Sequence, residues 1–327
     1  MNPRRRSTAF TLIELLVAVA ITAILAAIML ALTTGILRSW ARTQDRFTTD
    51  SEAALALGYL ERDLEAALFR PDGNTWLAVD VINTPATLAN HGWLAAGITK
   101  PAGAESQRYV PVNDDGTALP LSAARFGLSG AWLRFFTTNV EAGASLPVAV
   151  SYQIARRPVS GSVTSANPAA IRYSLFRSAV ASGTTFLVGY DILSGYGSPG
   201  ASPPAQRSAG TITNPNTAGD LLATNVVDFG VWLHAQDATG TLTRIFPVDA
   251  ADSTHTAATR AEFPLVVDVM VRVLTESGAT LIANLESGDG VVVRPANFAS
   301  DAEWWWATVE ANSRVYVRRV RVRSAGL

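Results

Sequence analysis

The architecture of this chain depends on residues 10–21, which read Phe10-Thr11-Leu12-Ile13-Glu14-Leu15-Leu16-Val17-Ala18-Val19-Ala20-Ile21. From residue 7 to residue 37 the only charged side chain is Glu14, and most of the others are apolar. At about 1.5 Å of rise per residue, a helix over residues 15–37 is about 34 Å long, enough to cross the roughly 30 Å hydrocarbon layer of a bilayer. The stretch therefore predicts one membrane-spanning helix.

The carboxylate of Glu14 is an unusual group at the start of such a helix, because a charge without a partner in lipid is energetically costly. Opposite charges attract strongly in a low dielectric and hardly at all in water. We therefore expect Glu14 to meet a positive group inside a packed bundle in the membrane.

The N-terminal residues carry a resemblance to a known family. A basic leader (Arg4-Arg5-Arg6), a small residue, Phe-Thr-Leu-Ile-Glu and an apolar run resemble the class III signal of type IV prepilins and pseudopilins. The resemblance implies that a prepilin peptidase cleaves between Ala9 and Phe10 and that Phe10 is then N-methylated. It also implies that Glu14 pairs with the N-terminal amine of a neighbouring subunit. The family usually has Gly before the cut, so Ala9 predicts slower processing, with no processing as the alternative.

Two other classes of N-terminal segment share some of these features. A cleavable secretory signal has an apolar region of about 7 to 15 residues and ends in a small-x-small site. The run here is about twice as long and begins with an acid, which disfavours that interpretation. A plain signal anchor with an incidental glutamate is the second alternative. We favour the prepilin signal because the leader, the Phe-Thr-Leu-Ile-Glu motif and the continuing helix occur together.

The rest of the chain divides by composition into a helix and a head. We assign residues 1–9 to the leader, 10–37 to the transmembrane part of the helix, 38–70 to its amphipathic extracytoplasmic part, and 71–327 to a β-rich head with a flexible loop near 195–220. A one-sided apolar stripe supports the amphipathic part; it comprises Ala53, Leu57, Leu60, Leu64 and Leu68. The turn-forming residues 71–74 then end the helix, at about Phe69.

The head shows the period-two alternation typical of strands. We predict strands at 76–79, 131–136, 148–154, 171–177, 185–188, 225–233 and 263–273. The tail 313–322 alternates with a slip at Arg318-Arg319, which predicts an edge strand with a bulge. We expect the arginines of this strand to lie on a solvated face. Contact with anionic lipid or with an acidic partner is the alternative. The predicted fold class is therefore α+β: a long N-terminal helix packed on a mostly antiparallel, pilin-like head.

Two further stretches bear on function. Residues 60–67, Leu60-Glu61-Arg62-Asp63-Leu64-Glu65-Ala66-Ala67, look like the corresponding region of the J-type minor pseudopilins of type II secretion, and the strand order of the head is similar too. A solvated charged face of an amphipathic helix explains the same residues. Trp304-Trp305-Trp306 cannot all share one face of a helix or strand. They are interpreted as core residues, with a partner-binding anchor as the alternative.

Composition favours a structural role over chemistry. The net charge is −1 and only 16% of the residues are charged, so no nucleic-acid partner is expected. The chain has no cysteine, and its three histidines, at 91, 234 and 255, are isolated in sequence. Residues 113–116 predict a turn, because they lack the spaced acids of a calcium loop. We therefore predict no catalytic residue, metal or cofactor, and no enzymatic activity.

The sequence thus predicts a minor pilin-like subunit, a pseudopilin, assembled into a type II secretion pseudopilus or a related filament. The expected partners are the prepilin peptidase, other pilin or pseudopilin subunits and a membrane crossed once. The leader arginines favour a cytoplasmic N-terminus, which places the head on the periplasmic side of the inner membrane. Two alternatives remain: a minor type IV pilin for adhesion or DNA uptake, and an unprocessed membrane-anchored envelope protein.

Overall fold

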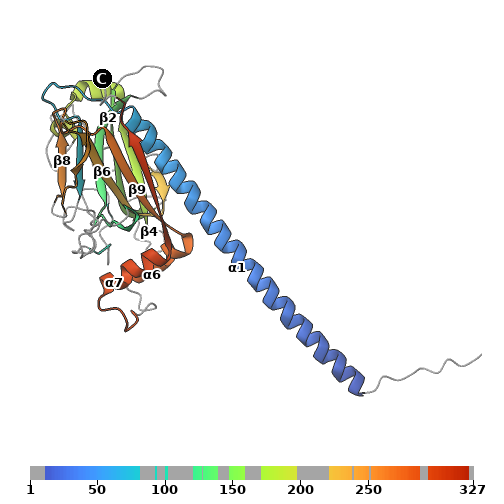
Figure 1. Ribbon diagram of the computed structural model, residues 1–327. Coiled ribbons are helices and arrows are strands. Elements are labelled where there is room, and N and C mark those ends of the chain that lie inside the picture. Colours follow the sequence, from blue (N-terminus) through green and yellow to red (C-terminus); the bar gives the residue numbers. More distant parts are fainter. Residues whose placement is uncertain are drawn as a thin grey trace, which may run out of the picture. The chain divides into compact units, whose positions relative to one another are not determined.

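The computed structural model describes residues 12–81, 93, 100–101, 121–126, 128–138, 147–158, 171–196, 221–237, 239–249, 252–287 and 294–323 of the 327-residue chain. A long N-terminal helix is followed by two antiparallel sheets with several shorter helices (Figure 1). The predicted α+β, pilin-like fold class is confirmed. The chain forms two compact units, Met1–Phe47 and Thr48–Leu327. The predicted leader and residues 197–220 of the predicted flexible loop lie outside the described residues.

The N-terminal helix α1 runs from Leu12 to Glu65. Its first 26 residues, Leu12–Leu37, are long and apolar enough to cross a membrane. The helix ends four residues before the predicted Phe69. The next residues join a sheet, because Ala67 forms a β-bridge with Thr137 and the Leu68 amide donates to Phe136 O at 2.8 Å. Bonds to a neighbouring strand therefore replace the next turn of the helix.

The larger sheet has six antiparallel strands. In spatial order they are β5 (Leu221–Thr224), β4 (Ile171–Val180), β3 (Pro147–Pro158), β2 (Ala131–Thr138), β1 (Leu77–Val81) and β8 (Thr254–Ala257). The strands predicted at 76–79, 131–136, 148–154 and 171–177 are β1 to β4. The strands β5 and β8 were not predicted, since four residues are too few to show a clear period.

The smaller sheet has four antiparallel strands, in the order β10-β9-β6-β7. They are β10 (Ser313–Arg321), β9 (Val266–Leu274), β6 (Val226–Gln236) and β7 (Leu242–Phe246). The hairpin between β6 and β7 turns at Asp237, whose Oδ1 accepts the amide hydrogens of Thr239 (2.8 Å) and Thr241 (2.9 Å). Gly240 supplies the positive φ of 87° that this turn needs.

The edge strand β10 was predicted, but its bulge was not found. The pairing with β9 is continuous from Ser313 opposite Leu274 to Arg321 opposite Val266. The apparent slip arises because Arg318 lies two residues before the buried Val320, on the same face of the strand, where strict alternation would place an apolar residue. Its guanidinium contacts Glu61 of α1, so a charged residue is accommodated there without a change of register.

Residues 48–65 of α1 pack on the head through one face of the helix. The buried residues on that face are Ala53, Ala56, Leu57, Leu60 and Leu64, all at most 5% exposed. Four of them belong to the predicted stripe, which is thus confirmed. The fifth predicted member, Leu68, lies beyond the helix end and packs partly buried against the same core. The burial of this apolar face is what stabilises the helix on the sheets.

The two sheets approach each other closely at β6. A side chain at Gly130 would place its Cβ 2.8 Å from Phe229 O, and one at Gly230 would place it 2.1 Å from the ring of Phe126. Gly130 also has a φ of 70°, which glycine adopts without strain. Glycine at these two positions therefore permits the tight contact between the layers.

Residues 185–188, predicted as a strand, lie instead in the helix α3 (Ser182–Val188). Thr185 and Val188, one helical turn apart, are the buried residues of this helix. The Thr185 hydroxyl donates to Val180 O at 3.1 Å, and its carbonyl accepts from the buried Tyr196 of α4 (Ile192–Tyr196). A four-residue apolar run does not distinguish a strand from a helix, and here these tertiary contacts decide.

The remaining helices are η2 (Leu121–Ala123), α6 (Glu276–Ser287) and α7 (Asp301–Ala311). Figure 1 shows α6 and α7 together at one end of the strands. Ser300 caps α7 by accepting the Glu303 amide at 3.1 Å. Of the three consecutive tryptophans in α7, Trp305 and Trp306 are buried and Trp304 is partly buried, so the core interpretation is confirmed for two of them.

Candidate assembly and anchoring sites

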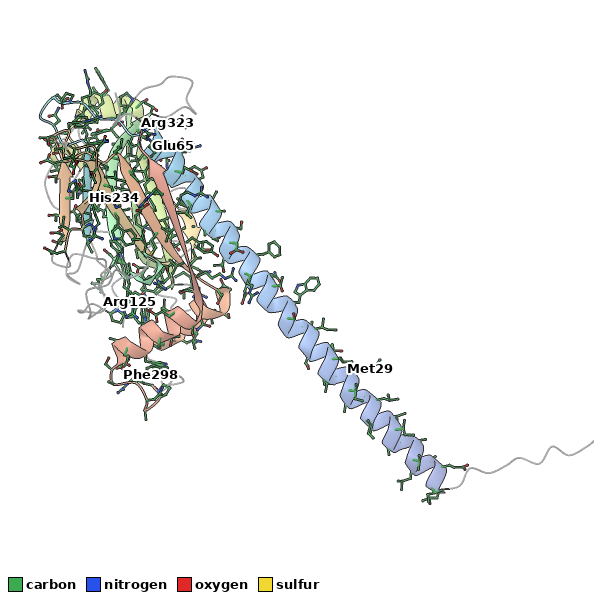
Figure 2. All side chains as sticks on the ribbon, viewed as in Figure 1. Met29, Glu65, Arg125, His234, Phe298 and Arg323 are labelled. Atoms are coloured by element: carbon green, nitrogen blue, oxygen red, sulfur yellow. The ribbon has the colours of Figure 1, made fainter. Side chains whose placement is uncertain are left out.

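The apolar part of α1, Leu12–Leu37, is long enough to cross a membrane and binds three of its threonine hydroxyls within the helix. The hydroxyls of Thr22, Thr33 and Thr34 donate to carbonyl oxygens four residues earlier, at 2.9, 2.8 and 2.9 Å. Such bonds matter in lipid, where no water is available to a hydroxyl. The large side chains of the segment, such as Met29 in Figure 2, extend outward from the helix and are exposed. Apart from Glu14 in its first turn, the segment therefore presents a largely apolar surface on all sides, suited to lipid or to other helices.

Three residues were predicted to act in processing and assembly. Glu14 lies near the start of α1, in the first turn that the structure describes, and it is exposed. Ala9 and Phe10 lie outside the described residues. The structure therefore places Glu14, the residue predicted to act in assembly, on the helix surface at the beginning of the apolar segment.

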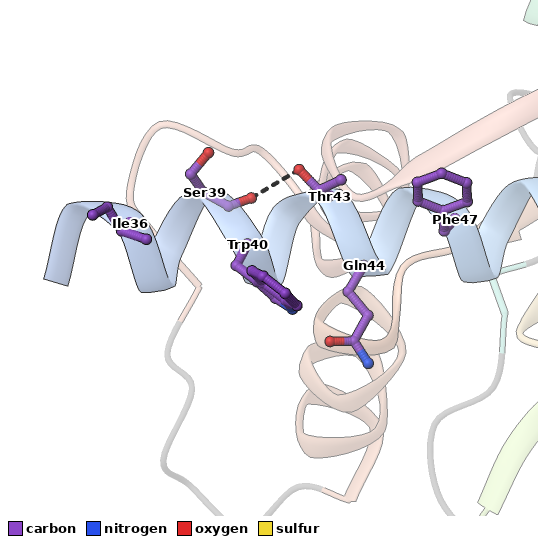
Figure 3. Close-up of a pocket in the computed structure, with 6 residues that line it drawn as sticks. All are labelled: Ile36, Ser39, Trp40, Thr43, Gln44 and Phe47. Carbon is purple, nitrogen blue, oxygen red and sulfur yellow. Dashed lines mark hydrogen bonds between the residues drawn. The ribbon is translucent and has the colours of Figure 1, made fainter. Parts of the chain in front are cut away.

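A second exposed apolar surface follows the membrane segment on α1. The residues Ile36, Ser39, Trp40, Thr43, Gln44 and Phe47 line a hollow on this part of the helix (Figure 3). Trp40 and Phe47 are 71% and 74% exposed. Thr43 donates its hydroxyl to Ser39 O at 3.0 Å, so this polar group is occupied within the helix. The surface is aromatic and available to a partner helix or to the membrane interface.

Asp63 anchors the end of α1 to the larger sheet. Its Oδ2 accepts the Tyr152 hydroxyl at 2.6 Å and Arg177 Nε at 2.7 Å, and its carbonyl accepts the Thr137 hydroxyl at 2.8 Å. The three donors lie on β2, β3 and β4. Burial, and then the Asp63 charge, raise the pKa of Tyr152 well above its usual value, so this hydroxyl stays protonated and donates. Asp63 therefore ties the helix to three strands at once.

Acids on the same helix also hold the smaller sheet. Asp50 accepts from Arg314 Nη1 at 3.2 Å, and Glu65 accepts from Arg323 Nη2 at 2.7 Å; the latter two residues are adjacent in Figure 2. Glu61 pairs with Arg318, as described above. These acids of α1 thus pair with arginines of the head, in addition to being exposed to solvent. These pairs hold β10 against α1, although each is exposed and contributes only about 0–1 kcal/mol.

The arginines of the C-terminal strand were predicted either to be solvated or to bind an acidic partner. In the structure Arg314, Arg318 and Arg323 pair with acids of α1, as above. A fourth, Arg319, makes a two-pronged bond to Asp268 of β9, with both N···O distances 2.7 Å. The acids they meet therefore come from the same chain.

A buried carboxylate joins α6 and α7 to the larger sheet. Glu286 of α6 accepts from Arg156 Nε (2.6 Å), the Tyr173 hydroxyl (2.6 Å) and Trp305 Nε1 (3.0 Å). Burial raises the pKa of the Tyr173 hydroxyl well above its usual value, which keeps this donor protonated. These bonds explain why a tryptophan with a polar N–H occurs inside α7.

A second buried ion pair links a loop residue to β6. Lys100 Nζ lies 2.6 Å from Asp228 Oδ1, and both side chains are fully buried. Lys100 Nζ also donates to Phe126 O at 2.7 Å, and Asp228 Oδ2 accepts the Phe126 amide at 3.0 Å. Burial lowers the pKa of the Lys100 amine, against the opposing effect of the Asp228 charge.

Neither Asp63 nor the Lys100–Asp228 pair was predicted from the sequence. Asp63 follows Ala56 and Leu60 at the spacing of one helical face, which signals a buried acid in an apolar stripe. Lys100 is the only lysine in a chain with 25 arginines, which also singles it out. Nothing in the sequence pairs it with Asp228, 128 residues away.

Within the part of the chain that the structure describes, no group of three or more His, Asp or Glu residues is placed to hold a metal ion. His234 contacts Asp268 at 3.8 Å, and the His255 ring bonds to Glu262 O at 2.9 Å. These two histidines thus have contacts within the head, and the third, at position 91, lies outside the described residues.

Comparison with known proteins bears on the N-terminal segment. Residues 4–30 match the prokaryotic N-terminal methylation motif. No curated protein and no solved structure matches the chain. The matched range contains the basic leader, the predicted cleavage site and Glu14.

Proposed function

Since residues 4–30 are a prokaryotic N-terminal methylation motif, the type IV prepilin-like signature, we propose that this pilin-like precursor is a minor pseudopilin of a type II secretion pseudopilus, nearest to the J type. The motif is the observation that carries the proposal. It implies processing by a prepilin peptidase and assembly with other pilin subunits. The apolar helix Leu12–Leu37 fits the single-pass membrane anchor typical of pilins.

In this proposal the peptidase cuts between Ala9 and Phe10, and the new terminus is methylated. Glu14 then lies fifth in the mature chain and pairs with the terminal amine of a neighbouring subunit in the membrane. The low dielectric of a packed helix bundle makes this pair strong, and water would make it weak. The pair between Glu14 and the neighbouring amine therefore contributes to association only where helices are packed together in the membrane.

Two features of α1 support the filament role. The exposed aromatic surface at Trp40 and Phe47 continues the apolar character of the helix past the membrane segment, where another subunit can cover it. The anchors at Asp63, Glu61 and Asp50 hold residues 48–65 to both sheets. A force applied to this part of the helix is thus transmitted to the head chiefly through the buried Asp63 and the buried apolar face of the helix.

The secretion role is preferred over DNA uptake or adhesion because of the C-terminal strand. Its basic face was the feature that hinted at a nucleic-acid ligand, and four of its arginines pair with acids of the same chain. The head is proposed to lie on the periplasmic side of the inner membrane, with the leader arginines in the cytoplasm.

Mass spectrometry of the native N-terminus tests the proposal against an unprocessed membrane anchor. We expect a mature chain that begins with methylated Phe10 when the protein is made with its own secretion system. A chain that keeps Met1 or the three leader arginines would contradict the proposal. Co-purification of sibling pseudopilins and a secretin, as opposed to a retractable pilus apparatus, separates the secretion system from the pilus alternative.

A further inference from the structure

The amine of Lys100 and the carboxylate of Asp228 are in direct, buried contact, and these are the two groups from which an amide bond forms. Nζ lies 2.6 Å from Oδ1, and neither side chain is exposed to solvent. The backbone of Phe126 contacts both groups: its carbonyl accepts from Nζ at 2.7 Å, and its N–H donates to the other carboxylate oxygen, Oδ2, at 3.0 Å. The two oxygens of Asp228 therefore differ in their partners: Oδ1 lies beside the amine and also accepts the Phe229 amide hydrogen at 3.1 Å, whereas Oδ2 accepts the Phe126 amide hydrogen.

The two contacts of the Phe126 backbone are the ones that an amide would require. An amide between Nζ and Cγ of Asp228 has one N–H and one carbonyl oxygen, and a buried amide needs a partner for each. The N–H would keep its bond to Phe126 O, and Oδ2 would keep its bond to Phe126 N. Formation of the amide also removes two charges from the interior, where a buried ion pair is expensive to desolvate.

We propose that Lys100 Nζ and Asp228 Cγ are joined by an intramolecular amide, an isopeptide bond. The ammonium transfers a proton to the carboxylate, and the neutral amine attacks Cγ. The N–C bond forms and the bond from Cγ to Oδ1 breaks; Oδ1 leaves as water with two of the three ammonium protons. Oδ2 becomes the amide oxygen, and the Phe126 N–H stabilises the negative charge that develops on it. No oxidant, reductant or cofactor is needed.

The surroundings favour this step. Burial lowers the pKa of Lys100, which favours the neutral, nucleophilic amine over the ammonium ion. The ring of Trp306 lies 5.4 Å from Nζ, and the fully buried site favours loss of water over hydrolysis. Arginine would not serve here, because a guanidinium remains protonated in proteins. The chain has one lysine, and it occupies this position, where a neutral amine is required.

The bond would do for this chain what a disulfide does for other exported proteins. The chain has no cysteine, so it has no disulfide to close a loop. A link between Lys100 and Asp228, 128 residues apart, ties the segment that follows β1 to β6 in the smaller sheet. Cross-links that close long loops restrict the unfolded chain most.

Peptide mapping of the purified full-length chain tests the proposal. Trypsin cuts after arginine and lysine but not before proline, so the bonds Arg70–Pro71 and Lys100–Pro101 remain intact. The digest should contain residues 63–108 joined to residues 208–244, at the summed mass less one water. Fragmentation should place the link at Lys100 and Asp228.

The variant Lys100→Arg is the matched control, because an arginine that precedes Pro101 also resists trypsin and the charge is kept. We expect its digest to release the two peptides separately at their full masses. Separate peptides in the wild-type digest would overturn the proposal and leave an ion pair. A joined species that persists in Lys100→Arg would also overturn it, since the link would then not involve this amine.

Discussion

Two aspartates of α1 allow a direct test of what anchors the helix to the head. Asp63 accepts from the Tyr152 hydroxyl and from Arg177, and Asp50 accepts from the Tyr316 hydroxyl and from an arginine as well. The two aspartates thus lie on the same helix, and each accepts from one tyrosine and one arginine of the head. They differ in burial: the Asp63 side chain is 5% exposed and the Asp50 side chain is 52% exposed.

Substitution of each aspartate by alanine should separate the two sites. The gain in helix propensity is the same for both changes, so it cancels in the comparison. Removing one partner of a buried ion pair costs about 3–5 kcal/mol. Arg177 keeps 19% exposure of its side chain, which places Asp63→Ala at the lower end, about 3 kcal/mol. The exposed pair of Asp50 contributes at most about 1 kcal/mol.

Urea unfolding of the full-length chain in detergent, followed by tryptophan emission, measures the difference. With a slope of about 3 kcal/mol per M, Asp63→Ala should lower the midpoint by about 1 M and Asp50→Ala by about 0.3 M or less. The slope itself should not change, because neither change alters the surface exposed on unfolding. Equal shifts for the two variants would refute the conclusion that burial makes Asp63 the stronger anchor.

Three further predictions concern assembly, packing and pH. Glu14→Leu should insert into the membrane normally but fail to co-purify with partner pilins; normal co-purification would show that the carboxylate has no pairing role. Gly230→Ala should lower the free energy of unfolding by about 1–3 kcal/mol, because its Cβ would meet a buried ring at 2.1 Å, whereas Gly58→Ala, with open space around it on α1, should raise stability by up to about 1 kcal/mol. If both glycine variants unfold at the wild-type urea concentration, the close approach at Gly230 is not real. Burial lowers the pKa of His234 and of His255 below 6.5, so the unfolded chain takes up protons first as the pH falls. The stability due to these neutral rings is present above about pH 6.5 and is lost at lower pH; the urea midpoint should fall between about pH 7 and about pH 5, and glutamine at both positions should flatten that fall.

The N-terminal helix could be predicted from the sequence because local patterns are enough there. An uninterrupted apolar run that contains one acid and no proline predicts a helix long and apolar enough to cross a membrane, whatever the rest of the chain does. The stripe from Ala53 to Leu64 likewise shows its buried face through spacing alone. The strands β2, β3, β4, β6 and β9 were predicted for the same reason, since each is long enough for alternation or β-branched content to show.

Only the tertiary structure decided the conformation of residues 185–188 and which charged residues meet. The four residues 185–188 have no period of their own, and contacts with Val180 and Tyr196 make them a helix. Arg314, Arg318 and Arg323 recur in the C-terminal sequence, yet their partners lie on a helix more than 250 residues earlier. Lys100 and Asp228 meet across 128 residues because two sheets and a loop fold together. Pairings of this kind depend on the whole fold, since a residue's sequence neighbours carry no information about a partner that the chain brings from far away.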